Sequence, residues 1–405
     1  MQTTINKALR AQLQQPALRL KNALEQELDH LLHWWAGNLT DEQHGGFYGR
    51  IDGHNRIHPT ANKGVLLNTG LLWAFSIAGR TCQSPVYRSL ADRAWYYIQA
   101  HFIDDVEGGV FRELDFRGAP IRTQKQVDSQ AFSIYAFSEY YRLSGNRETL
   151  RLAQEIFFLL ERYSFDKEKS GYLEALSREW MRLDAKENAV KTLHTHLHLL
   201  QAYTNLYRVY PDPSVRDALR ALIRCFIDQF IDPQSWHLRL HFDADWTNIS
   251  TTISFGHDLA VSWLLTDTAT VLGDASLLNQ CREIAVAMTR ACRAEGVDND
   301  GGFFYERVPG QYTDHGKYAW VQSEAVVGLL NAFQIRQEAE MFLAAQRSWD
   351  FIERAIRDKD GGTWHRKVNR EQVPVRSEDK VGSGHSTYHH VRALTEGIER
   401  INTFL

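Results

Sequence analysis

The sequence predicts an all-α protein whose helices form a closed ring of six two-helix units, an (α/α)6 barrel. A short glycine motif recurs along the chain at nearly constant spacing, and the segments between its copies have the hydrophobic period of α-helices. Each interval has room for two helices of about 15 residues and their loops. We therefore expect residues 1–405 to form a single domain, with the glycine loops as short β-hairpins at one mouth of the ring.

The motif consists of one or two glycines followed by aromatic or apolar residues. Its copies are Gly45-Gly46-Phe47-Tyr48, Gly108-Gly109-Val110-Phe111, Gly171-Tyr172-Leu173, the degenerate Ser235-Trp236-His237-Leu238, Gly301-Gly302-Phe303-Phe304 and Gly361-Gly362-Thr363-Trp364. Successive copies, counted from the first glycine or from Trp236, are 63, 63, 65, 65 and 60 residues apart. Because glycine tolerates the left-handed backbone of a tight turn, each copy is interpreted as a loop on one face.

Between the motifs, apolar residues recur at i, i+3, i+4 and i+7, which is typical of amphipathic or buried helices. The second helix of a unit is predicted at Val86–His101, Arg147–Tyr163, Ser214–Phe230, Ala275–Ala294 and Arg336–Ala355, with Asn146 and Asp274 as N-caps. Six such pairs can stack as an open solenoid or close into a ring. Solenoid repeats are usually shorter, about 33–47 residues, so the spacing favours closure.

The composition excludes several classes of protein. The chain has 405 residues, 43% apolar and 24% charged, with a net charge of −4, which does not favour nucleic acid as a partner. No apolar run approaches the roughly 18–20 residues that span a bilayer, and no signal-peptide core precedes the first helix. The four cysteines, too scattered for a disulfide framework or a zinc site, are Cys82, Cys225, Cys281 and Cys292. We expect a cytoplasmic monomer or homodimer that acts on a small molecule.

Three histidine clusters lie at the ends of predicted inner helices. His257 precedes the helix 259–265, although Asp258 as a helix cap beside a bystander histidine is the alternative. His385 and His389 open the last helix, where a structural role is the alternative. Closure of the ring is expected to bring the units of His257 and His389 face to face. His194 and His198 have the i, i+4 spacing of metal ligands, but no glutamate follows as in HExxH, so a polar helix face is favoured.

Carboxylates supply the other candidate groups. They are Asp128, Glu174, Glu179, Asp243, Asp258 and Glu324. Glu324 lies in an otherwise apolar helix, where an ionised carboxylate is costly unless it is paired or faces water, so a functional role is favoured there.

At these residues the chain resembles the N-acylglucosamine 2-epimerase superfamily, which includes cellobiose 2-epimerases, mannose 2-epimerases, mannose isomerases and aldose–ketose isomerases. The resemblance runs in order through nearly the whole chain, in the segments 45–49, 63–67, 130–136, 256–258, 320–328 and 388–389. It implies an (α/α)6 barrel, which agrees with the repeat count, and it implies neither a metal nor an organic cofactor.

The resemblance also implies a mechanism. The sugar ring opens, one histidine removes the proton α to the C1 aldehyde, and a cis-enediolate forms. In epimerisation a second histidine returns a proton to C2, whereas in isomerisation the proton goes to C1 and a ketose results. By motif, the two histidines are His257 and His389, whose imidazoles exchange protons near neutral pH. The residues expected to contact the sugar are Asn68, Trp73, Asp128, Glu179, His194, His198, Trp320, Glu324 and His385.

The chain departs from the family pattern around these positions. Gly70 stands where an arginine is usual, and Ala260 stands where a glutamate is usual. His194 replaces an asparagine, Asp128 an aromatic residue and Gly384 a tryptophan, and a tryptophan pair is reduced to Ala319-Trp320. These departures predict an altered substrate or reaction within the class, and the lost tryptophans favour a monosaccharide over a disaccharide; lost activity is the alternative.

The leading hypothesis is therefore a C2 epimerase of free reducing aldoses of the mannose and glucose type, with a 4-linked disaccharide such as cellobiose also considered. An aldose–ketose isomerase is the first alternative. An (α/α)6 glycoside hydrolase is a more distant one, and it needs two carboxylates across the scissile bond, for which Asp128, Asp243 and Glu324 are available. A sugar-binding toroid without catalytic activity is the third alternative.

Overall fold

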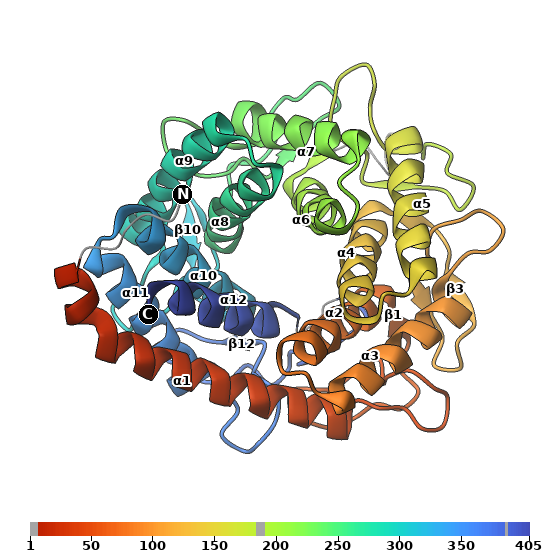
Figure 1. The fold of residues 1–405 in the computed structure, drawn as a ribbon, viewed down its shortest axis with the longest axis horizontal. Helices are drawn as coiled ribbons and strands as arrows, with labels where there is room; N and C mark the ends of the chain where they lie inside the picture. The colour runs from red at the N-terminus through yellow and green to blue at the C-terminus, as the bar shows by residue number, and fades with distance from the viewer. Residues whose placement is uncertain (1–6, 184–190, 385–387) are drawn as a thin grey trace.

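The computed structural model describes residues 7–183, 191–384 and 388–405, and over these ranges twelve α-helices form a ring in two layers (Figure 1). The inner helices are α2 (Val65–Thr81), α4 (Val127–Ser144), α6 (Leu193–Val209), α8 (Phe255–Leu272), α10 (Ala319–Arg336) and α12 (Tyr388–Phe404). The outer helices are α1 (Lys7–Asn38), α3 (Pro85–Tyr97), α5 (Arg147–Tyr163), α7 (Pro213–Cys225), α9 (Ala275–Gly296) and α11 (Ala339–Phe351). Three outer helices continue as π-helical turns, at Ile98–Phe102, Phe226–Phe230 and Ile352–Ile356.

The ring is closed, as the repeat spacing predicts. Each inner helix packs against the next from α2 to α12, and α12 in turn contacts α2. The inner helices are buried around most of their circumference because an outer helix covers each of them on the side away from the centre. None of the helices in the described ranges is long and apolar enough to cross a membrane.

The two ends of the chain form one helix pair. Inner and outer helices pair in sequence order from α2 with α3 to α10 with α11, but α12 pairs with α1, the first helix of the chain (Figure 1). The repeat count predicts six consecutive units and does not reveal this pairing. Its physical reason is that the apolar outer face of α12 has no later helix to cover it, and Leu24 and Leu31 of α1 are fully buried.

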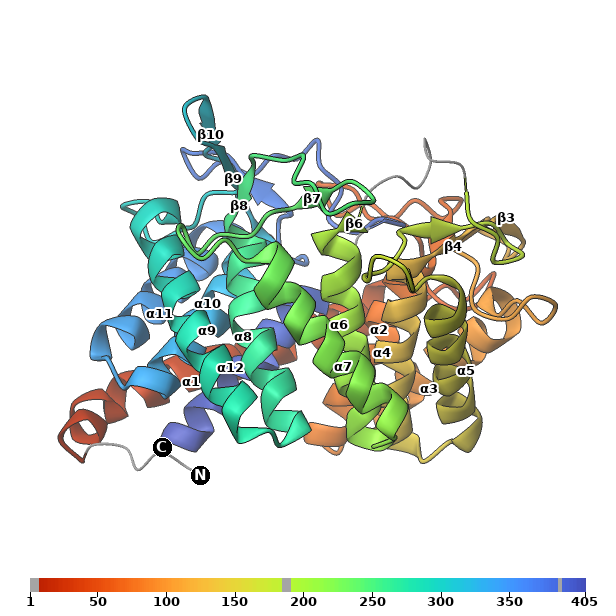
Figure 2. The same ribbon diagram turned by 90° about the horizontal axis from the view of Figure 1, so that it is seen from above.

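Short strands gather at one mouth of the ring, as predicted (Figure 2). They are β1 (Lys63–Gly64), β2 (Glu113–Leu114), β3 (Pro120–Arg122), β4 (Lys125–Gln126), β5 (Ala175–Leu176), β6 (Lys191–Thr192), β7 (His241–Phe242), β8 (Ile253–Ser254), β9 (Glu306–Val308), β10 (Tyr312–Asp314), β11 (Lys317–Tyr318) and β12 (Lys367–Val368). The strand that enters an inner helix pairs antiparallel with the strand after the next glycine motif, as β1 does with β2 and β4 with β5. A bridge between Ile51 and Val381 completes this pattern between the last unit and the first.

The glycine loops are tight turns, and the degenerate fourth copy keeps their backbone. Gly108 has a φ of 74°, and Trp236 holds the equivalent position with a φ of 62°. A tryptophan in the left-handed region is strained, so the surrounding contacts must hold it there. Its conformation confirms that Ser235-Trp236-His237-Leu238 is a copy of the motif.

A buried lysine–aspartate ion pair, which we call the clamp, joins the glycine loop to the strand that enters the inner helix in five of the six units. The pairs are Asp41–Lys63 (2.7 Å), Asp104–Lys125 (2.8 Å), Asp166–Lys191 (3.1 Å), Asp298–Lys317 (2.9 Å) and Asp358–Lys380. Lys63, Lys125 and Lys380 also donate to a backbone carbonyl of the loop. In the fourth unit Ile253 occupies the position of the lysine.

The predicted second helices agree with the structure except between α10 and α11. The predicted helix Arg336–Ala355 begins too early, because α10 runs to Arg336 and Gln337 then adopts a φ of 56° before α11 starts at Ala339. The predicted inner helix 259–265 is too short, because α8 runs from Phe255 to Leu272 and His257 lies in its first turn instead of preceding it. The predicted N-caps are confirmed: the side chain of Asn146 accepts from the Glu148 amide, and that of Asp274 accepts from the Leu277 amide.

The clamp predicts a large and specific effect on stability. Asp41→Asn keeps the shape of the side chain but leaves the ammonium of Lys63 buried without a counter-ion, so we expect a loss of about 3–5 kcal/mol in the free energy of unfolding. Urea unfolding followed by circular dichroism measures this loss. Asp245→Asn, which breaks the exposed Lys169–Asp245 pair, is the control and should cost about 0–1 kcal/mol. Equal effects of the two substitutions would contradict a structural role for the clamp.

Candidate active site

The first turns of the inner helices bring the predicted site residues to the strand-bearing mouth. Asp128, His194 and Trp320 are each the second residue of their helix, α4, α6 and α10 respectively. His198 and Glu324 follow one turn later, on the same faces of α6 and α10. The repeat therefore places different side chains at equivalent positions around one opening.

His257 is the third residue of α8, and one hydrogen bond fixes its ring. Its Nδ1 lies 2.9 Å from Oγ of Ser254, which leaves Nε2 for a ligand. Burial, assisted by the nearby charges of His194 and His389, lowers the pKa of His257 to about 3. The imidazole is therefore neutral at physiological pH and is able to accept a proton.

His389 is the second residue of α12 and is held by a carboxylate. Its Nδ1 lies 2.7 Å from Oε1 of Glu324, so Nε2 is again the nitrogen that no hydrogen bond among the described residues engages. Burial lowers the pKa of His389, and Glu324 opposes this effect by favouring the imidazolium form. His389 thus has a partner that stabilises its charged state, whereas His257 has only a hydroxyl.

Glu324 remains ionised although it is buried. Burial opposes its ionisation, but the charges of Arg392 and His389 and a hydrogen bond from Nε1 of Trp263 (2.9 Å) together lower its pKa to about 2. Arg392 donates to the same carboxylate oxygen as His389. Arg392 and Trp263 are not among the residues predicted for the site. The position of Arg392 three residues after His389, on the same helix face, is the sequence signal that points to it.

Trp320 lies between the two histidines. Its ring centroid is 5.0 Å from that of His257 and 5.7 Å from that of His389. The two histidines therefore flank α10 instead of facing each other across the ring, because only one inner helix separates α8 from α12. The arrangement places an imidazole on each side of an indole, a ring type that packs well against the apolar face of a sugar.

A second polar group lies on α4 and α6. Nε2 of His194 is 3.5 Å from Oδ2 of Asp128, and Nη1 of Arg112 is 3.1 Å from Oδ1 of the same carboxylate. Burial raises the pKa of Glu174, which lies close enough to feel the charges of His194 and Asp128. Arg112 was missed because it reaches the site from the loop before β2, where no sequence pattern marks it.

Asn68 and Trp73 lie in the packed wall of the ring instead of at its surface. Asn68 is fully buried and donates to the carbonyl of Gly64 at 2.9 Å. Trp73 is 3% exposed, with its ring stacked 5.3 Å from Tyr135 and edge-on to Tyr388. Since Tyr388 packs 4.0 Å from His389, the structure gives Trp73 a supporting role behind His389.

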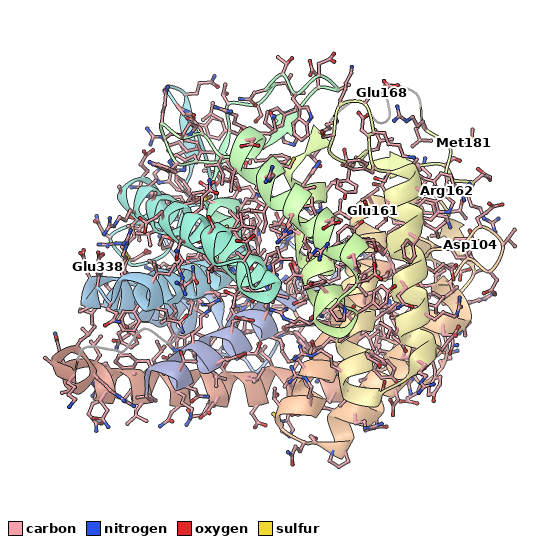
Figure 3. The ribbon with its side chains drawn as sticks, turned by 45° about the horizontal axis from the view of Figure 1, so that its top comes forward. Asp104, Glu161, Arg162, Glu168, Met181 and Glu338 are labelled. Atoms are coloured by element: carbon pink, nitrogen blue, oxygen red, sulfur yellow. The ribbon has the colours of Figure 1, made fainter. Side chains whose placement is uncertain are left out.

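Glu179 lies away from this group. It is exposed on the turn after β5, and its carboxylate accepts from the hydroxyl of Ser177 at 2.8 Å. Met181, two residues later, lies at the periphery of the ring (Figure 3). His385 falls outside the described residues.

The described residues contain one group of three potential metal ligands, and it is not the His194–His198 pair. The ligand atoms of His237, Asp258 and Cys292 lie within 4.8 Å of one another. The Asp258 carboxylate is 2.7 Å from Nδ1 of His237, accepts the Leu238 amide at 2.9 Å and is 3.7 Å from Sγ of Cys292. These contacts satisfy the buried carboxylate without an ion. Asp258 thus anchors the glycine loop of the fourth unit and does not act as a cap for its helix.

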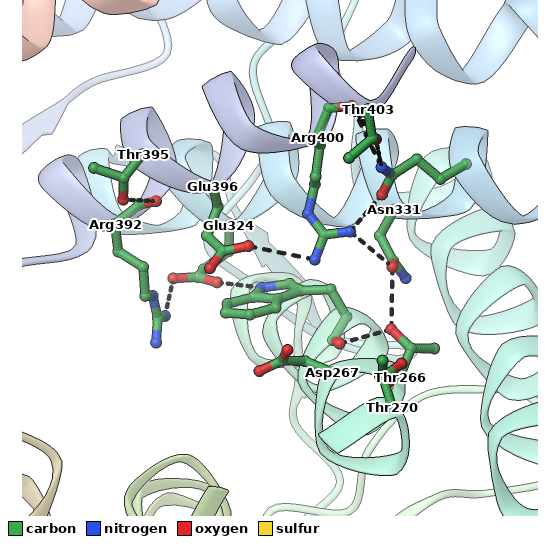
Figure 4. Close-up of polar contacts among 12 residues, drawn as sticks. Thr266, Asp267, Thr270, Glu324, Asn331, Arg392, Thr395, Glu396, Arg400 and Thr403 are labelled. Carbon is green, nitrogen blue, oxygen red and sulfur yellow. Dashed lines mark hydrogen bonds and ion pairs between the residues drawn. The ribbon is translucent and has the colours of Figure 1, made fainter. Parts of the chain in front are cut away.

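A separate cavity of about 870 Å³ opens at the other end of the ring. Its lining includes Asn331, Glu396 and Arg400, and it contains none of the predicted site residues. Figure 4 shows Arg400 and Asn331 to the right of Glu324 and Arg392. Trp263 connects the two ends, because its indole donates to Glu324 and its carbonyl accepts from the hydroxyl of Thr266 at 2.8 Å.

Comparisons with known proteins agree with the architecture and with the sequence resemblance. A cellobiose 2-epimerase from Bacteroides fragilis is 39% identical over 385 residues, which cover 93% of this chain and 98% of the relative. A D-mannose isomerase from Thermobifida fusca is 21% identical over 308 residues, 72% of this chain and 74% of the relative. The structure of cellobiose 2-epimerase from Bacillus thermoamylovorans B4167 superposes with a TM-score of 0.90 at 33% identity, covering 94% of this chain and 99% of that one. Residues 46–393 match the family described as N-acylglucosamine 2-epimerase (GlcNAc 2-epimerase), and the chain therefore belongs to this family of carbohydrate epimerases and isomerases.

Proposed function

We propose that the protein epimerises free reducing aldoses at C2, with His257 and His389 as the proton-transfer residues. The observation that carries this proposal is the position of the two imidazoles on either side of Trp320, 5.0 Å and 5.7 Å from its ring. Each imidazole has Nδ1 engaged by the protein and Nε2 left for a substrate. A sugar held against Trp320 thus has a proton acceptor on one side and a proton donor on the other.

His257 is the better base. With Nδ1–H donated to Ser254, its neutral Nε2 accepts the C2 proton, which the C1 aldehyde of the open-chain sugar makes acidic. The C2–H bond breaks, and its electron pair passes into a cis-enediolate. The low pKa of His257, about 3, keeps it neutral in the resting site.

His389 is the better acid. Its Nδ1 donates to Glu324, whose ionised carboxylate stabilises the imidazolium form as the aspartate of a catalytic triad does. Nε2 then delivers a proton to the opposite face of C2, and the C1 carbonyl forms again. Conversion of the epimer back to the first sugar exchanges the two roles.

Isomerisation to a ketose needs the same residues and differs only in the carbon that receives the proton. The relatives include epimerases named for cellobiose and an isomerase named for mannose, so both outcomes are available to this fold. For the substrate we propose a free aldose of the mannose and glucose type, or a 4-linked disaccharide such as cellobiose. Neither proton transfer requires a metal or an organic cofactor.

The glycoside hydrolase alternative has less support. It needs one protonated carboxylic acid, but Asp128, Asp243 and Glu324 all have a pKa below the ordinary value. The carboxylate of Asp243 is occupied by the backbone amides of Asp245 and Thr247 in a surface turn.

Deuterium incorporation tests the reaction. In D2O with mannose, glucose, fructose, lyxose or cellobiose, the wild-type protein should place deuterium at C2 of at least one aldose and form its epimer. NMR spectroscopy separates the epimer from a ketose by their carbon signals. The absence of both product and C2 exchange across this panel would leave the non-catalytic toroid as the better reading.

The histidines are tested by substitution. His257→Ala and His389→Ala should each lower kcat by about 10²–10⁴-fold, because each removes a proton-transfer group. His58→Ala is the matched control, since His58 is also a carboxylate-paired histidine (Nε2 3.2 Å from Oδ2 of Asp52), and it should retain full activity. Retained activity in both site variants, with loss on substitution of a carboxylate, would favour the hydrolase instead.

Glu324→Gln tests whether a carboxylate partner makes His389, and not His257, the proton donor. A negative neighbour raises the pKa of an imidazole, so its removal should lower the pKa of His389. Activity that depends on protonated His389 falls as pH rises through this pKa, and the alkaline limb of the kcat–pH profile should therefore shift to lower pH, with a loss of about 10–100-fold at neutral pH. An unchanged alkaline limb of the kcat–pH profile would show that Glu324 does not determine the pKa of His389.

A further inference from the structure

We infer that His194 is a third proton-transfer residue, positioned by Asp128, which opens the sugar ring before the C2 chemistry. The inference rests on the proposed function, because only a sugar that reacts through its open-chain aldehyde needs such a step. It goes beyond the substrate contact that the sequence predicts for both residues.

Asp128 holds His194 in one orientation. Asp128 is 8% exposed, and both of its carboxylate oxygens are engaged. Oδ1 accepts from Nη1 of Arg112 at 3.1 Å and from Oγ of Ser129 at 2.9 Å, which leaves Oδ2 for Nε2 of His194 at 3.5 Å. Burial opposes ionisation, but His194 and Arg112 outweigh it and hold the pKa of Asp128 well below its usual range. Asp128 is therefore a permanent negative partner for His194.

The opposite nitrogen of His194 is the one that can react. Nε2 faces Asp128 at 3.5 Å, so Nδ1, on the other side of the ring, is the nitrogen available to accept a proton, and the side chain is 50% exposed. The ring of His198 packs edge-on at 4.4 Å and limits rotation of His194. His198 is itself unsuited to carry a proton, because burial holds its pKa well below the ordinary value.

His194 is close to the two histidines of the proposed reaction. The charge of His194 lowers the pKa of both His257 and His389. His194, His257 and His389 all lie in the first turns of inner helices, α6, α8 and α12, so the three imidazoles lie at the same mouth of the ring. They differ in their partners: a hydroxyl for His257, a carboxylate linked to Arg392 for His389, and a carboxylate linked to Arg112 for His194. The His194–Asp128 pair on α6 and α4 thus repeats the His389–Glu324 pair of α12 and α10.

Ring opening requires the chemistry that this pair supplies. The proton of the C1 hydroxyl must leave while the C1–O5 bond breaks, C1 becomes a carbonyl, and O5 takes up a proton. Nδ1 of His194 accepts the hydroxyl proton, and Asp128 stabilises the imidazolium that forms. A water molecule supplies the proton to O5, and the imidazolium of His194 then gives its proton to the hydroxide that remains, which restores both the water and the neutral imidazole. The C2 proton is untouched, so this step is separable from epimerisation.

Anomer interconversion measures ring opening without any C2 chemistry. Exchange NMR spectroscopy between the α and β H1 signals of mannose and of cellobiose gives the rate with and without protein. We expect the wild-type protein to accelerate this exchange, and His194→Ala and Asp128→Asn to lower the enzyme-dependent rate by about 10–100-fold. His257→Ala should retain it although it has lost epimerisation.

Two further variants separate proton transfer from binding or folding. His194→Gln keeps size and hydrogen bonding but carries no proton at neutral pH, so it should fail like alanine, whereas a contact residue would tolerate glutamine. Asp128→Glu keeps the charge and should recover part of the rate. Asp52→Asn, which removes the carboxylate from the His58 pair, is the control and should leave anomerisation unchanged.

The results of these experiments separate a failure of the His194 assignment from a failure of the proposed epimerase activity. Epimerisation without accelerated anomerisation by the wild-type protein, or full anomerisation by His194→Gln, would overturn the inference and leave the proposed function intact. Anomerisation lost in His194→Ala, but no C2 exchange with any sugar in the wild-type protein, would support the His194 assignment and overturn the epimerase.

Discussion

The architecture depends on the clamp, the buried lysine–aspartate pair that recurs in five units. A buried ion pair contributes little net stability relative to an apolar pair, but breaking one is costly because a charge is left without a partner. The clamp therefore fixes the position of an inner helix relative to its glycine loop. In these five units it fixes the start of the inner helix against the glycine loop of the same unit, while the paired strands tie that start to the loop of the next unit. Asp128, His194 and Trp320 thus come to equivalent positions, each as the second residue of a clamped helix.

The fourth unit shows what happens where the clamp is absent. Ile253 replaces the lysine, and Asp258 holds the loop through His237 and the Leu238 amide. In the second, third and fifth units Gln130, His196 and Gln322 take the position of Asp258, and each bonds the backbone of its glycine loop. The unit without the lysine is also the one that carries His257. The fourth unit thus lacks the buried lysine close to the helix that carries His257, the residue proposed as the base.

Periodicity made the fold predictable from the sequence, because the glycine motif and the helical spacing are local patterns. The pairing of α1 with α12 was not predictable in this way, since it joins segments more than three hundred residues apart and no motif records it. At the site, His257, His389 and Glu324 were identified and lie together. Asn68 and Trp73 were predicted to contact the sugar, but both side chains are buried between helices of the ring. A sequence motif shows which residues recur, but it does not show which side of a helix is covered by its neighbours. Arg112 was not predicted because it reaches the site from a loop, outside the helices whose hydrophobic period identifies their inner faces.

The shared pair of α1 and α12 has a consequence for how freely the chain can be rearranged. The first and last helices pack against each other as two consecutive helices of one unit do. Both Lys7 and Phe404 line the cavity at the end of the ring opposite the strands. The barrel thus has no intrinsic starting point. A circular permutant that joins these ends with a short linker and opens the exposed turn at Gly145, between α4 and α5, would bury the same contacts and present the same side chains at the mouth.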